Sequence, residues 1–488
     1  MNQDQNHTDQ ETQNEHKPTI KRRTPMKRWK FILIIVMTIM ITAIVTVVAT
    51  ISLQHKLSGL DKDERHAIHK FTDAYKTVHH DYYKNTNTDK LIDEAIRGMV
   101  KSLDDPYSEY MDKDKTKAFN ENVSGDFVGI GAEMQKKDGY IMITSPMKKS
   151  PAEKAGLKSK DIVTHVDGKS IKNKPLEAVV KMVRGEKGTT VTLTVNRAGD
   201  KKDIKIKRDV IHVKSVEYKE QDNIGVIAIN KFQSGTAAEL KNAVLKAHKN
   251  GNKQIVIDLR NNPGGLLDEA IKMANIFIDK GKTVIKLDNG NEKESIQAPI
   301  EPLKEAKGMK VSILVNEGSA SASEVFTGAL KDHNIAKVYG SKTFGKGIVQ
   351  TTHEYNDGSL LKFTDMKWLT PDGHYVQGKG IKPDVDIKRP AYETLSIIPD
   401  KTTLKHGDDN KHVKTIKVGL QALGYNIDQT STSYDKQLEQ AVTAFQKDHH
   451  LKTHGQFDKA TNQAFTEQLV KLSTQKDNVL SKLIKQLK

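Results

Sequence analysis

The chain contains no cysteine. This absence excludes disulfide bonds, thiolate zinc sites and a cysteine nucleophile, so a nucleophile would have to be a serine, threonine, lysine or carboxylate. Aromatic residues make up only 6% of the chain, and its 18 histidines form no close pair with metal-ligand spacing on a helical pattern. We therefore expect no metal and no other cofactor. The proportions of glycine, proline and charged residues are those of an ordinary globular protein.

Acidic residues are scarce relative to basic ones, 62 against 78, which leaves a formal net charge of +16. Such a charge suggests an anionic partner, and nucleic acid, anionic lipid and an anionic cell-wall polymer all qualify. Nucleic acid is disfavoured because the chain shows no zinc module, no aromatic-basic RNA-binding strand and no basic helix with heptads. At 488 residues the chain is too long for one hydrophobic core, so three or more folded units are expected.

One long apolar run lies near the N-terminus, because residues 31–53 carry no charge and about 20 apolar residues suffice to cross a bilayer as a helix. The alternative is a cleaved signal peptide, but its apolar region would be only about 7–15 residues long and would precede a small-x-small site, which is missing. The residues before the run include Lys21, Arg22, Arg23, Lys27, Arg28 and Lys30. By the positive-inside rule, we predict a single-pass cell-membrane protein with residues 1–30 as a disordered, basic cytoplasmic tail and the rest extracytoplasmic.

The pattern of the chain changes after this segment. Residues 63–115 begin with two amphipathic helical stretches, which end before Asp105-Pro106 because the residue before proline is driven out of the helical region. Residues 116–198 hold short strand-like runs with glycine turns, typical of a small barrel-like domain. Strands then alternate with helices in residues 208–387, which predicts an α/β core with a partly parallel sheet.

The C-terminal quarter is polar at first and then helical. Residues 388–412 contain proline and are interpreted as a linker. A helical module is expected over residues 413–470, followed by a helical tail over residues 471–488.

Two segments of the α/β core suggest catalytic chemistry at strand ends. Residues 258–265 read DLRNNPGG, and a glycine pair after a strand lets backbone N–H groups approach a ligand, as an oxyanion hole requires. A plain left-handed turn is an equally simple interpretation. Residues 315–324, VNEGSASASE, place a serine at a strand-to-helix turn, where the helix dipole stabilises negative charge. Such a serine is more often a simple helix N-cap.

A third segment, residues 342–350, reads KTFGKGIVQ. Glycines flank Lys346 and apolar residues surround it, so its amine could be partly desolvated. Desolvation lowers the pKa of a lysine and allows it to act as a general base. A solvated turn lysine is the alternative.

Taken together, residues 70–390 resemble the carboxyl-terminal processing proteases, also called tail-specific or CtpA-like proteases. The motifs DPYS, DLRNNPGG, GSASASE, TFGKGIVQ and TPDGHYVQGKGIKPD occur in the family's order. The resemblance implies that Ser321 is the nucleophile, that Lys346 is the base and that Gln350 orients the lysine. Asp332 is a less favoured third member, since a carboxylate beside Lys346 would keep the lysine protonated. Ser319 and Ser323 are interpreted as structural.

The implied reaction is acyl transfer from a peptide carbonyl to Ser321. Neutral Lys346 would take the serine proton, and water would later release the acyl group. The backbone N–H groups of Gly264, Gly265 and Ala322 would stabilise the tetrahedral oxyanion.

Residues 116–198 also resemble a PDZ domain. The implied carboxylate-binding loop and substrate-binding residues are Gly125, Phe127, Val128, Gly129, Ile130 and Gly131. PDZ domains add a peptide as a strand and hold its terminal carboxylate, so protein or peptide substrates with free C-termini are expected. The resemblance further implies that docking moves this domain and opens the active site, with Arg184 as a candidate sensor; a plain surface charge is the alternative.

The helical module resembles a three-helix peptidoglycan-binding domain, because the pattern LQ…GY…FQ…G…D…T occurs in order within residues 413–470. A generic helical tail is the alternative. An anionic cell wall would be a suitable target for the positive charge of the chain.

The sequence thus predicts a multidomain α/β protein with a transmembrane helix, a PDZ domain, a Ser-Lys protease core and a peptidoglycan-binding module. The expected function is that of a membrane-anchored extracytoplasmic endopeptidase that cleaves proteins near their C-termini. The alternative, a catalytically latent, wall-tethered PDZ scaffold, would be expected to lose Ser321, Lys346 or Gln350, and all three are present. A wall hydrolase would need paired acidic residues or metal ligands, and none stands out.

Overall fold

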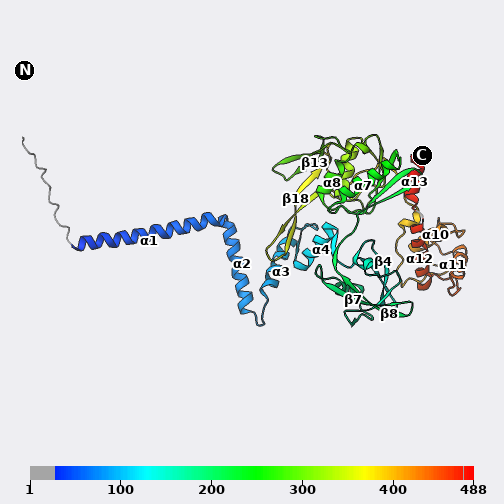
Figure 1. Cartoon of the computed structure of the whole chain (residues 1–488), viewed down its shortest axis with the longest axis horizontal. Helices are drawn as coiled ribbons and strands as arrows, with labels where there is room; N and C mark the ends of the chain where they lie inside the picture. The colour runs from blue at the N-terminus through cyan, green and yellow to red at the C-terminus, as the bar shows by residue number, and fades with distance from the viewer. Residues whose placement is uncertain (1–27, 476) are drawn as a thin grey trace, which may run out of the picture. The chain divides into compact units, whose positions relative to one another are not determined.

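The computed structural model describes residues 28–475 and 477–488, so most of the predicted tail, residues 1–30, lies outside the described residues. The chain divides into two compact units, residues 1–94 and 95–488. In the first unit, helix α1 (Arg28–Ser58) contains the apolar stretch Trp29–Ile51, which is long and apolar enough to cross a membrane. Helix α2 (Lys62–Asp81) is a separate helix (Figure 1). Its start is fixed by a capping box in which Asp61 and Glu64 bond each other's backbone N–H groups.

Helix α3 (Thr88–Lys101) crosses the boundary between the units, and strand β1 (Glu109–Met111) and helix α4 (Lys113–Ser124) follow it in the second unit. Residues 116–124 of the predicted PDZ range therefore belong to a helix. Gly125 ends that helix in the left-handed conformation, with φ +73°, and donates its N–H to the carbonyl of Glu121. Strand β2 (Asp126–Gly129) then pairs with β9 (Asp209–His212) in a separate two-stranded ribbon.

The expected barrel-like domain is an antiparallel sheet in the order β3-β4-β5-β7-β8, with β6 paired to β5. In the second half of β8, Ile204 and Ile206 are buried and Lys205 and Lys207 are exposed, which is the pattern of a sheet with one face on a core. The elements are β3 (Ala132–Lys137), β4 (Tyr140–Pro146), α5 (Pro151–Lys154), β5 (Ile162–Val166), β6 (Lys169–Ser170), α6 (Leu176–Val183), β7 (Thr190–Arg197) and β8 (Asp200–Lys207).

The α/β core contains a six-stranded sheet in the order β10-β11-β12-β15-β16-β19, parallel except between β10 and β11. Its elements are β10 (Val216–Gln221), β11 (Ile224–Ile229), α7 (Thr236–Lys249), β12 (Gln254–Asp258), α8 (Leu267–Ala274), β15 (Lys310–Val315), α9 (Ala322–Asp332), β16 (Ala336–Gly340) and β19 (Val385–Asp386). Ile255 and Ile257 pack in the cluster that contains α7, α8 and α9, whereas Val256 packs with helix α13 (Asn478–Leu487). Helices therefore cover both faces, and the central strands β11, β12 and β15 are largely apolar, whereas the edge strand β10 is mostly exposed.

A second, antiparallel sheet was not predicted. It has the order β1-β18-β13-β14, with β17 paired to β18. Its strands are β13 (Thr283–Asp288), β14 (Lys293–Gln297), β17 (Ile348–Glu354) and β18 (Leu360–Leu369), and a short 3-10 turn, η1 (Lys304–Ala306), follows β14. The sheet is hard to find from the sequence because β17 is largely exposed and β1 pairs with a strand about 250 positions later.

The C-terminal module is built from three helices, α10 (Lys411–Ala422), α11 (Lys436–Asp448) and α12 (Lys459–Gln475). Ile398 and Leu404, from the segment expected to be a linker, are buried in its core. The 3-10 turn η2 (Ala391–Thr394) precedes the module. The expected helical tail, residues 471–488, belongs to two helices. Residues 471–475 are the end of α12, and residues 478–487 form α13, which packs on the protease sheet.

Candidate active site

Ser321 lies at the turn between β15 and α9, at the N-cap position of the helix, and has φ +54°. A non-glycine residue held in this region stores strain of about 1–3 kcal/mol, and such residues cluster at active sites. Ser319 and Ser323, on either side of Ser321, are fully buried, and their hydroxyl groups bond backbone carbonyls. Ser319 Oγ donates to the carbonyl of Leu259 at 2.8 Å, and Ser323 Oγ donates to the carbonyl of Asn262 at 2.9 Å. The turn is therefore pinned to the loop of residues 258–265, which we call the glycine loop.

Glu324 connects the turn between β15 and α9, which we call the serine turn, to residues 342–350, which we call the lysine segment. Its fully buried carboxylate accepts hydrogen bonds from the N–H of Ser321 at 2.9 Å and the N–H of Lys346 at 2.8 Å. It also accepts from Thr343 Oγ1 and the N–H of Gly345. No role was predicted for Glu324 from the motifs, although the Ser-x-x-Glu spacing is the signature of a capping box and could have singled it out.

Lys346 precedes β17, and its Nζ donates to Oε1 of Gln350 at 2.7 Å. Burial lowers the pKa of Lys346 below that of an ordinary lysine, and the nearby charge of Lys362 lowers it further. The carboxylate of Asp105 opposes this shift, and the ring of Tyr107, with its centroid 4.4 Å from Nζ, also favours the charged amine. The net effect is a lysine that loses its proton more readily than a solvated one.

Gln350 lies on strand β17 and is itself held in place. Its Nε2 is 3.4 Å from Thr364 Oγ1, which donates to Asp105 Oδ2 at 2.7 Å. Ser108 Oγ donates to the same oxygen at 2.6 Å. Asp105 and Ser108 of the DPYS motif thus hold Thr364, which contacts Gln350, the residue that bonds Lys346. The motif had been used only as part of the family resemblance, and this role was not predicted.

The glycine loop approaches the turn that carries Ser321 closely. A Cβ on Gly264, which has φ +98°, would lie 2.7 Å from the carbonyl oxygen of Ala320 and 2.9 Å from the nitrogen of Ala322. The N–H of Gly264 donates to Asn262 Oδ1 at 2.9 Å. Of the three expected oxyanion donors, the N–H of Gly264 is therefore already used in a hydrogen bond within the loop. Ala322 is the first residue of α9, so its N–H has no acceptor within the helix.

A cavity of about 410 Å³ contains Ser321, Lys346 and Gln350 together, and Gly265 and Ala322 also line it. Its other walls are largely apolar, formed by Phe119, Val123, Pro263, Leu266, Leu267, Val325, Ile348, Val349 and Trp368. This is a volume that can hold a few substrate side chains. The arrangement places a strained serine and a partly desolvated lysine in one largely apolar cavity suited to acyl transfer.

A second groove, of about 190 Å³, lies between the β2–β3 segment and α6. Four of the predicted PDZ residues line it, namely Phe127, Gly129, Ile130 and Gly131, opposite Leu176, Val180 and Val183. Gly131 has φ +72°, and a Cβ there would lie 2.5 Å from Ser150 Cβ, so the loop requires glycine. Gly125 and Val128 instead line neighbouring cavities.

Arg184 lies at the end of α6, where it lines the same groove. Its guanidinium pairs with Glu121 of α4 at 2.5 Å and stacks on the ring of Phe127, 4.9 Å from the centroid. Arg184 thus contacts both the groove and the helix that leads to it.

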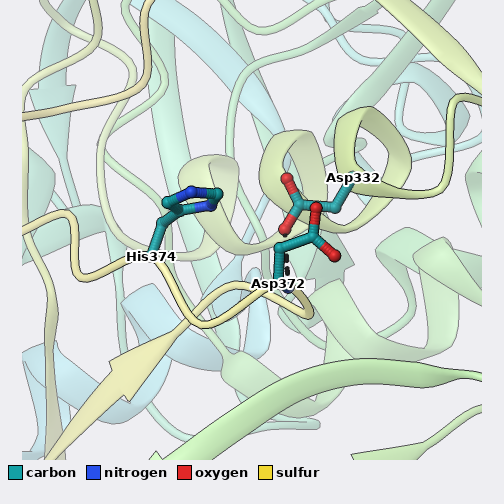
Figure 2. Close-up of side chains that lie close together, drawn as sticks. All are labelled: Asp332, Asp372 and His374. Carbon is teal, nitrogen blue, oxygen red and sulfur yellow. Dashed lines mark hydrogen bonds between the residues drawn. The ribbon is translucent and has the colours of Figure 1, made fainter.

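Asp332 is placed at the opposite end of α9 from Ser321, about 15 Å away along the helix axis. Figure 2 shows it beside Asp372 and His374, and its Oδ2 accepts the N–H of Asp372 at 2.9 Å. The potential ligand atoms of the three residues lie within 4.8 Å of one another, but Asp372 and His374 are exposed. The carboxylate that acts on Lys346 is Asp105, not Asp332.

Models of known families match four parts of the chain. Peptidase family S41 matches residues 223–387, and the N-terminal domain of the activating protease CtpB matches residues 40–115. A PDZ domain matches residues 128–207, and a putative peptidoglycan binding domain matches residues 409–465.

Curated relatives match almost the whole chain. A probable CtpA-like serine protease of Staphylococcus haemolyticus (strain JCSC1435) is 61% identical over 487 residues, which cover 100% of this chain and 97% of the relative. One of Staphylococcus aureus (strain COL) is 63% identical over 467 residues, 96% of this chain and 94% of the relative. Among solved structures, a photosystem II D1 C-terminal processing protease is 26% identical and covers 65% of this chain and 92% of its own, with a TM-score of 0.40.

Proposed function

Because this chain belongs to the CtpA-like serine proteases of peptidase family S41, we propose that it is an endopeptidase with Ser321 as nucleophile and Lys346 as general base. The family membership confirms the resemblance predicted from the motifs, including the PDZ and peptidoglycan-binding domains. The observation that carries the proposal is one cavity lined both by a strained serine and by a lysine whose pKa is lowered by burial and whose amine is held by Gln350.

In the proposed mechanism, neutral Lys346 accepts the proton of Ser321 as the serine oxygen attacks a peptide carbonyl. The N–H of Ala322, at the positive end of the α9 dipole, and that of Gly265 are the donors suited to the oxyanion. The protonated lysine then gives its proton to the departing amine, and a water molecule activated by the same lysine releases the acyl group.

We further propose that the groove between the β2–β3 segment and α6, which we call the PDZ groove, binds the free C-terminus of a protein substrate. The groove combines apolar walls with the segment of residues 129–131, whose backbone closely approaches Ser150 at Gly131, as capture of a terminal carboxylate by backbone N–H groups requires. Arg184, which contacts both this groove and α4, is suited to report that the groove is filled.

Helix α1 supports anchoring in a membrane by its length and apolar composition. With the basic residues before it on the cytoplasmic side, the protease and the peptidoglycan-binding domain would both lie outside the membrane, next to the cell wall. Proteins with free C-termini in that space are the proposed substrates.

A test of tail recognition uses one unstructured protein substrate in two forms, with a free and with an amidated C-terminus. Amidation removes charge-assisted hydrogen bonds worth about 1.5–3 kcal/mol, so kcat/KM of the detergent-purified full chain is expected to fall roughly 10- to 100-fold. In the groove variant Val180→Glu, the preference for the free form should disappear, whereas Lys181→Glu, on the exposed side of the same helix, should keep it. Equal cleavage of both forms by the unmodified protein would contradict the proposal.

The pH dependence of kcat/KM tests whether Lys346 is the general base, because two variants that remove charges of opposite sign near it should shift its pKa in opposite directions. Activity requires neutral Lys346, so it should rise with pH through the lowered pKa of this lysine. The charge of Asp105 raises that pKa, so Asp105→Asn should move the acid limb of the profile to lower pH. The charge of Lys362 lowers it, so Lys362→Met should move the limb to higher pH. An acid limb that stays in place in both variants would exclude Lys346 as the titrating base.

A further inference from the structure

The helix that ends the chain is part of the protease core. Helix α13 buries Val479, Leu483 and Ile484 on the sheet face opposite to α7, α8 and α9. Its end is also fixed, because Gln254 Nε2 donates to the carbonyl of Leu487 at 3.1 Å and Lys488 pairs with Asp222 at 3.0 Å. The peptidoglycan-binding domain is therefore an insertion between β19 and α13 rather than a terminal appendage.

Asp477, the N-cap of α13, connects this helix to the glycine loop. Its carboxylate accepts the N–H of Leu480 at 2.9 Å and a bond from Arg260 Nη1 at 2.9 Å, and it forms a second bond with Nη2. Arg260 also bonds Asp258 through Nε at 2.9 Å and Nη2 at 2.6 Å. Burial lowers the pKa of Arg260 and raises that of Asp477, but the hydrogen bonds outweigh burial. The pKa of Arg260 is therefore raised and that of Asp477 lowered. The guanidinium is thus held between two carboxylates, one 2 residues before it in the sequence and the other 217 residues after it.

Arg260 belongs to the segment that braces the nucleophile. The next residue, Asn261, has φ +57°, and its N–H donates to Asn316 Oδ1 at 2.8 Å in the serine turn. Asn262 then bonds the carbonyl of Ile229 and the N–H of Gly264. A shift of Arg260 would be transmitted through these bonds to Gly264 and Gly265, beside Ser321.

We propose that Asp477 is a positioning residue for the protease, which acts through Arg260 to hold the glycine loop against the nucleophile. It touches no reacting atom, and its carboxylate reaches the loop only because α13 is docked on the sheet. The inference rests on the proposed Ser321 chemistry. It gives the last twelve residues of the chain a function in catalysis that their position beyond the peptidoglycan-binding domain does not suggest.

The test measures kcat and KM of the full-length, detergent-purified protein on a peptide substrate, together with the affinity of a peptidyl boronate, whose tetrahedral adduct requires the oxyanion donors. Asp477→Asn keeps a good N-cap residue but loses the charge pair. We expect kcat to fall about 10- to 100-fold, as for a misplaced reacting group, with KM unchanged and with boronate affinity reduced in parallel. Asp477→Glu should recover part of kcat.

Lys488→Ala, which removes the ion pair at the other end of α13, is the matched control and should keep the unmodified kcat. In an Arg260→Gln background, Asp477→Asn should cause no further loss, because the two residues act as one unit. A kcat within twofold of the unmodified protein in Asp477→Asn, or losses that simply multiply in the double variant, would overturn the positioning role. Ser321→Ala, measured alongside, separates the two proposals, because cleavage that survives this change would overturn the proposed function itself.

Discussion

Replacing Ser321 by alanine is expected to lower kcat for cleavage of an unstructured protein by about 10⁴-fold or more, since the acyl-enzyme can no longer form. Lys346→Ala should cost a similar factor, and the double variant should be little worse than either single one, because nucleophile and base act as a unit. Lys346→Arg should not restore activity, because the guanidinium stays protonated at any working pH.

Single-turnover cleavage and covalent labelling by a fluorophosphonate are the measurements for these variants. Matched controls lie close by. Ser341 is partly exposed and bonds Glu317, and Lys342 is exposed four positions before Lys346, so alanine at either position should leave cleavage and labelling unchanged. Labelling of the Ser321→Ala protein at full rate would identify another residue as the nucleophile. Full cleavage by Lys346→Ala would remove the lysine from the mechanism.

Glu324→Ala is expected to have the next largest effect, on both stability and activity. The change leaves the N–H groups of Ser321, Gly345 and Lys346 and the hydroxyl of Thr343 buried without their acceptor. Each unsatisfied group costs about 1–3 kcal/mol, so the protease domain should lose about 3 kcal/mol or more of its free energy of unfolding. Because the same carboxylate fixes the serine turn and the lysine segment relative to each other, kcat should fall by about 100-fold or more.

Thermal unfolding followed by near-ultraviolet circular dichroism, with kcat measured well below the transition, separates these two effects. Glu324→Gln keeps one acceptor oxygen and should give intermediate values for both quantities. Glu317→Gln, at an exposed carboxylate seven positions earlier, is the control and should change neither. A Glu324→Ala protein with an unmodified melting temperature and kcat would show that the buried carboxylate does not organise the site.

Most of the architecture could be predicted from local patterns. The uncharged run near the N-terminus predicted a long apolar helix, and the apolar strands alternating with amphipathic helices predicted the α/β core. The motif order predicted the family, which the matches confirm. These features are local in the chain, where hydrophobic periodicity and turn residues carry the information. The roles of Ser321, Lys346 and Gln350 came from the resemblance and stay predictions until the variants are measured.

Other features depend on pairings across long stretches of chain. Asp105 reaches Thr364 only because β1 pairs with β18, and the bond that joins Glu324 to Lys346 requires the turn after β16 to return to the serine helix.

The sequence by itself therefore determined the domain order, the apolar N-terminal helix and the segments that carry the chemistry. Only the tertiary structure decided what holds those segments: the buried Glu324, the support from Asp105, the position of Asp332 outside the cavity, and the docking of α13 through Asp477 and Arg260. The physical reason is that periodicity records which face of an element is buried, whereas the partner that covers it is set by strand register and packing between residues far apart in sequence.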